Sequence, residues 1–234
     1  RADLSNLTVR EEVRGGLQAR QERHNLLIDD TGRIAARLSA GVERLAFVAD
    51  NAGRELLLDL VLADWLLGHG WAGMIILYLK GQPFFVSDAM PRDVEALLAR
   101  LGNGPLGRRL AGHLAAGRLA LAVDPFWTRC LTFRQMPEHL ATELARAGLV
   151  ILKGDVNYRR LLDDAHWPPT ARVEQVAAYF PAPFVTLRTL KGEIIAGLQP
   201  GQAEALAARD PEWLINGKRG IIQYVNREKV DRGE

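Results

Sequence analysis

The sequence predicts an α/β fold, a three-layer αβα sandwich with a largely parallel central sheet preceded by N-terminal helices. Apolar runs of strand length recur along the chain and are separated by helical segments, which is the pattern of a βα-repeating sheet. Most of these runs are continuously apolar, as is typical of parallel strands that helices cover on both faces. A chain of 234 residues is long enough to bury one substantial core.

The N-terminal part of the chain is expected to be helical. Residues 1–22 are polar and rich in Arg, Glu and Gln, so we predict a partly exposed helix, and Leu26–Leu38 is predicted to form a second one. We therefore divide the chain into a helical segment over residues 1–40 and an α/β domain over residues 41–234. The chain begins with Arg1 rather than Met, which is typical of a fragment or a processed product.

Strands and helices then alternate. The segment 55–67 carries apolar residues almost all round, as in a helix packed on a sheet, and 91–101 opens with a proline that suits a helix start. Residues 84–86 are strand-like. The remaining predicted strands are the apolar runs 45–49, 74–79, 119–123, 149–152, 184–187 and 221–224. The order of these strands in the sheet is not readable from the sequence.

Composition narrows the functional classes. The net charge of +2 argues against a nucleic-acid footprint, and no apolar run approaches the roughly 20 residues that span a bilayer. The single Cys130 excludes an intrachain disulfide and fits a reducing compartment, so we predict a cytoplasmic protein. Neither a nucleic acid nor a membrane is an expected partner, and the oligomeric state is left open.

A metal site is predicted where the first strand of the domain ends. Asp50 and Asn51 follow the run 45–49, and Gly53 permits a turn there. Asp88 comes shortly after the strand-like residues 84–86. Carboxylate and amide oxygens of this kind suit Mg²⁺ or Mn²⁺ rather than zinc. The alternative is structural, because Asp and Asn after strands are common turn formers and helix N-caps.

Two further polar clusters follow predicted strands. The run Lys153–Arg160 contains Gly154 and opens a helix, which makes it a candidate phosphate site. Its alternative is an N-cap at Asp155 followed by solvated basic residues. The run Arg188–Lys191 is either a third part of the same site or a basic turn. Polar clusters gathered at one edge of the sheet would distinguish a binding site from scattered surface charge.

Other motifs carry little weight. The stretch 102–107 formally satisfies G-x-G-x-x-G, but it follows a helix, contains a proline and lacks the later acid of a dinucleotide site. The histidines show no H-E-x-x-H or paired spacing, so zinc hydrolysis is not indicated. Cys130 has no motif around it and is interpreted as a packed thiol.

Several motifs occur together and in order, and together they resemble a known family. They are Asp50-Asn51-x-Gly53-x-Glu55 with Asp59, Phe85-Val86-Ser87-Asp88, Lys153-Gly154-Asp155-x-Asn157-Tyr158-Arg159, Arg188-Thr189-x-Lys191, Asp163 followed by Trp167-Pro168-Pro169-Thr170, and Gly217-Lys218. The set resembles the metal-dependent damage-control phosphatase family, formerly domain of unknown function 89. Within it, the chain is most similar to the acidic residue methyltransferase-like branch with the Arg-Thr-x-Lys motif.

The resemblance implies a three-layer α/β domain that binds one divalent cation, Mg²⁺, Mn²⁺, Co²⁺ or Ni²⁺. The implied ligands, which are also the implied catalytic residues, are Asp50, Asn51 and Asp88. The implied substrate-binding residues are Glu55, Lys153, Asp155, Asn157, Tyr158, Arg159, Arg188 and Lys191. Family members usually carry a larger N-terminal helical region, of which residues 1–40 would be a remnant.

The leading functional hypothesis is a metal-dependent phosphatase that hydrolyses small phosphorylated metabolites, such as hexose phosphates, in metabolite damage control. Phosphoryl transfer needs a Lewis acid and cations around the developing charge, and the predicted site supplies both. The nucleophile is either an activated water or the carboxylate of Asp50 or Asp88. Two alternatives stay open, an S-adenosylmethionine-dependent protein carboxyl methyltransferase and a non-catalytic metabolite-binding module. The physiological substrate and the preferred metal are not indicated.

Overall fold

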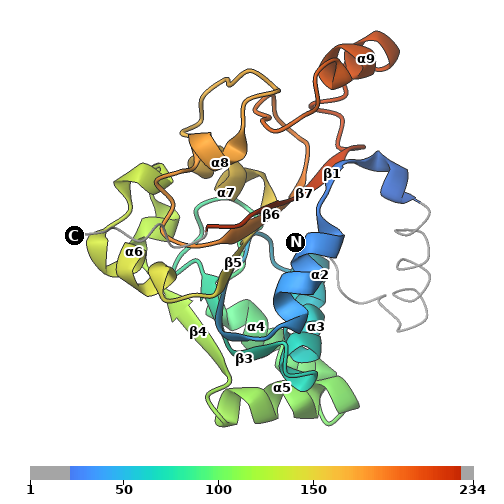
Figure 1. Ribbon diagram of the computed structural model, residues 1–234. Helices are drawn as coiled ribbons and strands as arrows, with labels where there is room; N and C mark the ends of the chain where they lie inside the picture. Colours follow the sequence, from blue (N-terminus) through green and yellow to red (C-terminus); the bar gives the residue numbers. More distant parts are fainter. Residues whose placement is uncertain (1–21, 228–234) are drawn as a thin grey trace.

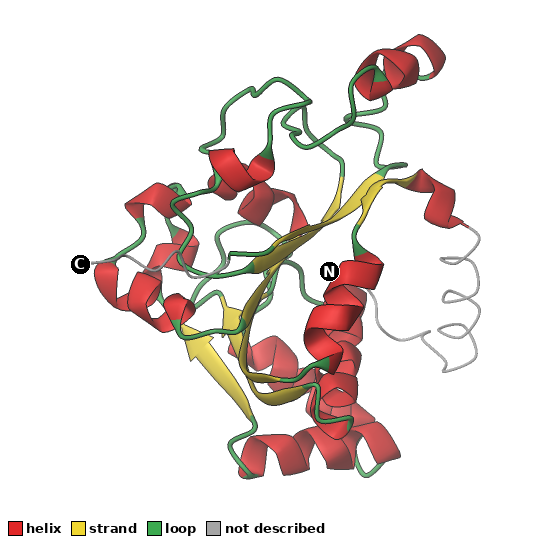
Figure 2. Ribbon diagram, viewed as in Figure 1, coloured by secondary structure: helices red, strands yellow, loops and turns green. Residues whose placement is uncertain are grey.

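The computed structural model describes residues 22–227, in which one seven-stranded sheet forms the centre of the molecule (Figures 1 and 2). The strand order across the sheet is β1-β7-β6-β5-β2-β3-β4. The strands are β1 (Leu26–Asp29), β2 (Val42–Val48), β3 (Ala72–Leu79), β4 (Leu119–Val123), β5 (Leu149–Lys153), β6 (Phe184–Thr189) and β7 (Gly220–Val225).

The order of the strands reverses beside β2. The chain runs from β2 outward through β3 to β4 on one side, whereas β5 and β6 lie on the other side. All neighbouring pairs from β6 to β4 are parallel. The strand β7 is antiparallel to β6, and β1 is parallel to β7, so two strands run against the others. The largely parallel sheet is therefore confirmed, and its topological switch point lies between β2 and β5.

Helices cover both faces of the sheet. The α-helices are α2 (Thr31–Ser39), α3 (Arg54–Gly68), α4 (Pro91–Leu101), α5 (Pro105–Ala115), α6 (Glu138–Ala145), α7 (Gly154–Leu161), α8 (Val173–Val176) and α9 (Gln202–Arg209). The short 3-10 helices are η2 (Glu22–Asn25), η3 (Pro125–Thr128) and η4 (Phe133–Gln135). Figure 1 shows α2 to α5 on one side of the sheet and α6 to α8 on the other. The helix α9 lies at the periphery and buries none of its residues.

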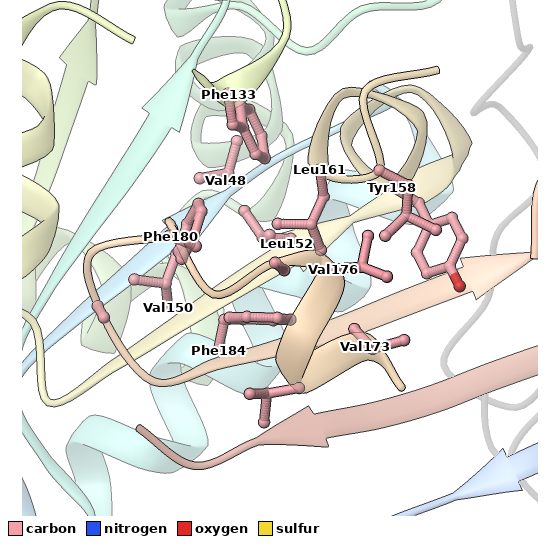
Figure 3. Packing of buried hydrophobic residues seen from close by; sticks show 14 of the residues in the cluster. Val48, Phe133, Val150, Leu152, Tyr158, Leu161, Val173, Val176, Phe180 and Phe184 are labelled. Carbon is pink, nitrogen blue, oxygen red and sulfur yellow. The ribbon is translucent and has the colours of Figure 1, made fainter. Parts of the chain in front are cut away.

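The two faces have separate hydrophobic cores because successive strand residues point to opposite sides. In β2, Leu45 and Phe47 face the core beneath α3, α4 and α5. Ala46 and Val48 face the other core, which includes Leu140 of α6 and residues of α7 and α8. Figure 3 shows part of this second cluster, in which the aromatic side chains of Phe133, Tyr158, Phe180 and Phe184 pack among aliphatic ones. Both faces being covered confirms the predicted three layers.

Most predicted elements are present within a few residues of their predicted bounds. The strands predicted at 45–49, 74–79, 119–123, 149–152, 184–187 and 221–224 correspond to β2, β3, β4, β5, β6 and β7. The predicted helices at 55–67 and 91–101 correspond to α3 and α4. The stretch 102–107 links α4 to α5, with Gly102 ending one helix and Gly104 preceding the next. Within residues 22–227, none of the helices is both long and apolar enough to cross a bilayer.

The predicted helix over 26–38 is wrong in its first half. Residues 26–29 form β1, which pairs with β7, and α2 begins only at Thr31. The carboxylate of Asp29 accepts hydrogen bonds from the backbone N–H and the hydroxyl of Thr31, at 3.1 and 2.5 Å, and this turn separates strand from helix. The helix predicted for residues 1–22 lies outside the described residues, apart from Glu22. The boundary at residue 40 stays a prediction, although β1 belongs to the same sheet as the rest.

The strand-like stretch 84–86 is not a strand. It lies in the loop between β3 and α4, where Phe85 is half exposed and Val86 is fully exposed. Gly81 and Pro83 precede it, and proline removes a donor that a central strand would need. The loop instead makes a single bridge between Asn51 and Asp88.

Candidate active site

The switch point of the sheet carries the first group of predicted site residues. Val48 of β2 is in register with Tyr78 of β3 and with Leu152 of β5. Two residues further on, Asp50 therefore lies between Lys80 on one side and Gly154 on the other. Open α/β sheets bind ligands at this position, beyond the carboxyl ends of the strands where the strand order reverses.

Backbone hydrogen bonds bring Asp88 to the same place. The N–H of Ala52 donates to the carbonyl of Ser87 at 2.7 Å, and the N–H of Ala89 donates to the carbonyl of Asp50 at 2.9 Å. The carboxylate of Asp88 also accepts from the backbone N–H of Phe84 at 2.8 Å, and from that of the next residue. The loop thus delivers a buried carboxylate to the end of β2 although it is not a strand.

The side chain of Asn51 connects the acidic residues. Its amide nitrogen donates to Asp50 Oδ2 and to Glu55 Oε2, both at 2.9 Å. Its amide oxygen accepts from the hydroxyl of Ser87 at 2.5 Å. The three predicted metal ligands are therefore adjacent. Metal ligation through the oxygen of Asn51 would require the amide to turn over and release Ser87.

The backbone of Gly154 lies directly against the carboxylate of Asp50. Its φ is +82°, and a Cβ added there would lie 1.8 Å from Asp50 Oδ2. Only glycine fits a position that combines this backbone conformation with so close an approach. The pKa of Asp50 is raised to about 6, chiefly by burial and then by the neighbouring charges of Glu55 and Asp88, against the effect of the nearby lysines.

Lys80 is a further charged residue of the site, and it was not among the site residues predicted from the sequence. This lysine follows β3 directly, and its side chain is 2% exposed. Its Nζ lies 3.9 Å from Asp88 Oδ1. Burial lowers the pKa of Lys80, while Asp88 and Asp50 act in the opposite direction. Lys153 was predicted because a lysine directly follows an apolar run. The same pattern is present at Lys80 and would have predicted it too.

Lys153, the last residue of β5, forms a second charged group with two acids of α3. Its Nζ lies 3.0 Å from Asp59 Oδ1 and 3.2 Å from Glu55 Oε1. Burial lowers the pKa of Lys153, but the two carboxylates outweigh burial and the net pKa is raised. Burial raises the pKa of Asp59 to about 6, although Lys153 opposes this shift.

The donor chemistry of Asp50, Asn51 and Asp88 fits a hard divalent cation. Two carboxylates and one amide leave several coordination positions for water, as Mg²⁺ and Mn²⁺ require. The carboxylates of Asp50, Glu55 and Asp88 repel one another, and a cation among them would relieve that repulsion. Residues 22–227 contain no cluster of three or more His, Cys, Asp and Glu side chains placed to hold a metal ion.

Arg188 lies beneath the site with its guanidinium fully buried. Its Nε donates to Asp155 Oδ1 at 2.6 Å, Nη2 donates to the carbonyl of Gly192 at 3.1 Å, and Nη1 donates to the carbonyl of Ile194. The guanidinium carbon lies 4.4 Å from the centre of the Tyr158 ring. The donors of Arg188 are thus engaged within the protein, where they fix the turn that carries Lys191.

Asn157 and Tyr158 are also fully buried. The amide nitrogen of Asn157 donates to the carbonyl of Lys153 at 2.8 Å, which ties the start of α7 to the end of β5. The hydroxyl of Tyr158 accepts from the N–H of Ala196 at 3.1 Å, and burial raises its pKa to about 12. Their predicted contact with substrate stays a prediction, because in this conformation both side chains lie below the surface.

The exposed cations lie around this buried group. Arg159 is half exposed and paired with Asp164 through bonds of 2.6 and 3.0 Å. Lys191 is exposed and has no ion-pair partner among residues 22–227. Because β7 is antiparallel to β6, the exposed Lys218 before β7 comes to the same edge, where the N–H of Leu190 donates to the carbonyl of Arg219 at 2.9 Å.

Comparison with known proteins shows what the chain is similar to. Residues 1–206 match the family described as the damage-control phosphatase ARMT1-like domain. The mouse protein named damage-control phosphatase ARMT1 is 38% identical over 216 residues, which cover 85% of this chain and 49% of the mouse protein. The rat protein of the same name is 40% identical with the same coverage. The human one is 38% identical over 198 residues, covering 80% of this chain and 45% of the human protein.

The chain therefore spans about half the length of the relatives it matches. Among solved structures, a DUF89 family protein from Pyrococcus horikoshii superposes with a TM-score of 0.49 at 16% identity, over 84% of this chain and 52% of that one.

Proposed function

This chain belongs to the damage-control phosphatase ARMT1-like domain family, and we propose that it is a divalent-metal-dependent phosphomonoesterase acting on small phosphorylated metabolites. The observation that carries the proposal is the convergence of Asp50, Asn51 and Asp88 at the switch point of the sheet. Cations accompany them: Lys80 and Lys153 are largely buried, and Lys191 is exposed.

In this proposal Asp50, Asn51 and Asp88 hold the metal ion. Bound there, the ion would supply Lewis-acid stabilisation of the charge on the phosphoryl oxygens. Gly154 and the loop carrying Asp88 fix the two carboxylates before any ligand arrives. Such preorganised charge costs no rearrangement during the reaction.

The cations of the chain act on the phosphoryl group. Lys191 is the exposed cation at the end of β6, and it would donate to the phosphoryl oxygens as their charge develops. Lys153 is held by Glu55 and Asp59, so its position is fixed and part of its charge is already compensated. The attacking group would be a water molecule or the Asp50 carboxylate, and both fit this arrangement.

We further propose hexose phosphates among the substrates and a cytoplasmic location, which the lone Cys130 fits. The relatives are named damage-control phosphatases, which supports phosphate hydrolysis over methyl transfer. The glycines of the stretch 102–107 link two helices and offer no cofactor loop after a strand.

Phosphate release from a panel of sugar phosphates tests the proposal. We expect release with Mg²⁺, Mn²⁺, Co²⁺ or Ni²⁺, and none after chelation. Asp50→Ala should lower kcat by at least roughly 10³-fold, since it removes a metal ligand at the reacting centre. Glu95→Ala, which changes an exposed acid on α4, is the matched control and should be neutral. Release that survives both chelation and Asp50→Ala would refute the proposal.

A further inference from the structure

A cavity of about 250 Å³ opens beside the candidate active site. Its walls are Phe84 and Phe85, the loop 129–132 and the outer surface of α7. The backbone N–H groups of the two phenylalanines donate to Asp88, so the same residues line the cavity and hold a proposed metal ligand. A substrate with its phosphoryl group at the metal would therefore extend into this cavity.

The cavity carries excess positive charge. Three arginines are among its lining residues, Arg129, Arg159 and Arg160, against the single acidic residue Asp164. Arg129 is exposed and has no ion-pair partner among the residues that the structure describes. The pair between Arg159 and Asp164 is half exposed on both sides, so it contributes little energy and an incoming anion can replace it.

Arg160 is the buried member of this group, with 7% of its surface exposed. Its Nε donates to the carbonyl of Leu131 at 2.7 Å and its Nη2 to the carbonyl of Phe126 at 3.0 Å, while Nη1 has no hydrogen-bond partner. Within residues 22–227 it pairs with no carboxylate, and the ring of Phe126, 4.2 Å away, is its closest aromatic partner.

Burial lowers the pKa of Arg160 to about 10, which leaves the group charged at neutral pH. A buried charge without a counter-charge is unfavourable. An anion in the adjoining cavity would supply that counter-charge.

The geometry of α7 sets the separation between the two charged regions. Gly154 at the start of α7 touches Asp50, and Arg160 lies six residues later on the same helix. With a rise of 1.5 Å per residue, they are roughly 9 Å apart along the helix axis. A sugar-sized spacer fits this separation, with Phe84 and Phe85 available to contact its apolar surface.

We propose, building on the phosphatase function above, that this cavity is a second anion subsite that binds the far end of the substrate. The substrates it selects are phosphomonoesters with a second anionic group about a sugar's length away, that is, sugar bisphosphates or phosphorylated sugar acids. The transferred phosphoryl group lies at Asp50 and Asp88, and the second phosphate or carboxylate lies among Arg129, Arg159 and Arg160.

A substrate comparison tests this subsite. Phosphate release is measured for a hexose 6-phosphate, a hexose 1,6-bisphosphate and a 6-phosphorylated sugar acid. We expect kcat/KM to be at least roughly tenfold higher for either bis-anionic compound than for the monophosphate, the effect of about one added charge contact. Arg129→Gln should bring this ratio close to one, and Arg129→Lys should retain most of it. Arg108→Gln, on an exposed arginine of the distant helix α5, is the matched control and should leave the ratio unchanged.

Equal kcat/KM values for the monophosphate and both bis-anionic compounds would overturn the subsite, as would an undiminished ratio in Arg129→Gln. If no compound releases phosphate, the proposed phosphatase function fails instead, and binding then decides the subsite. In that case the hexose 1,6-bisphosphate and the hexose 6-phosphate are titrated calorimetrically into the wild-type protein and Arg129→Gln in the presence of Mn²⁺. Tighter binding of the bisphosphate that Arg129→Gln abolishes supports the subsite, and equal binding refutes it.

Discussion

The two halves of the charged site are held in different ways. At the ends of β2 and β3, Asp50, Lys80 and Asp88 are 8%, 2% and 5% exposed and lie within a continuous set of hydrogen bonds and charge contacts. After the end of β6 and before the start of β7, Lys191 and Lys218 are exposed, and neither has an ion-pair partner among residues 22–227. One half is fixed by the fold, and the other is free to adjust to a ligand.

This difference indicates how the two halves respond to substitution. A buried group surrounded by backbone cannot relax, so a change of one atom there displaces its neighbours. An exposed lysine can be removed without disturbing the fold, and only its interaction with the ligand is lost. Substitutions in the buried half should therefore change metal binding and activity together, while those in the exposed half should change activity alone.

Among the substitutions that test this comparison, the largest effect is expected for Gly154→Ala. The added Cβ would lie 1.8 Å from Asp50 Oδ2, so the carboxylate must move. We expect Mn²⁺ affinity, measured by calorimetry, to fall at least tenfold, and kcat/KM to fall by roughly 10²-fold or more, the scale associated with misplacement by about 1 Å.

Gly201→Ala is the control for backbone strain. Gly201, which precedes α9, has a φ of +78°, close to the +82° of Gly154, but nothing lies within 4 Å of its Cβ position. Its substitution should lower stability without affecting metal affinity. Equal metal affinity in the two variants would show that Gly154 is needed only for its backbone conformation, and the comparison of the two halves would fail.

The next effect is that of Lys191→Ala. Because this lysine is exposed and forms no ion pair with any residue of 22–227, we expect the melting temperature and Mn²⁺ affinity to stay near the wild-type values. Its loss should lower kcat by roughly 10²-fold, as when one charge-stabilising donor is removed. Lys191→Met should be equally poor, since it keeps much of the apolar stem but not the charge. A variant with unchanged kcat and raised KM would show instead that Lys191 binds the ground state only.

The smallest expected effect concerns the free energy of unfolding, to which the buried Asp59 makes a contribution that depends on pH. Burial raises the pKa of Asp59 from 3.8 to about 6, so the folded protein retains a proton at pH values where the unfolded chain has lost it. The contribution of Asp59 to stability is then greatest below the lower pKa and falls as pH rises to the higher one, by roughly 3 kcal/mol.

Asp59→Asn should remove this pH dependence. Free energies of unfolding measured from pH 4 to 7 should show the stability of the variant rising relative to that of the wild type by roughly 2 kcal/mol across the series. Lys153 keeps Glu55 as a partner in the variant, so the difference reports mainly on Asp59. Parallel curves for the two proteins would contradict a raised pKa.

The sequence predicted the parts of the fold and the site that depend on local pattern. The strands β2 to β7 are apolar runs bounded by polar residues, and Asp50 and Lys153 stand where two of them end. Neighbouring parallel strands have their carboxyl ends at one edge of the sheet, so the residues after β2 and β5 were expected to meet. The close contact between Gly154 and the carboxylate of Asp50 shows that they do.

What could not be predicted depends on contacts between distant segments. The strand β1 has four residues and only Asp30 separates it from α2, so its pairing with β7, almost the whole described chain away, leaves no local signal. The burial of Arg188 depends on carbonyls of a turn, those of Gly192 and Ile194, whose position no pattern reveals. Residues 84–86 looked like a strand because they are apolar, yet Val86 is left exposed.

The pairing of β1 with β7 also determines how the sheet ends. Without β1, the outer side of β7 would present unpaired N–H and C=O groups to other chains, the usual starting point of edge-to-edge aggregation. The protecting strand and the strand it protects come from opposite ends of the described chain, so this edge is closed only after both have formed. Such a distant pairing carries a high loop-closure cost and belongs late in folding. During synthesis, the molecule would therefore complete the edge that carries the candidate active site before it becomes resistant to self-association.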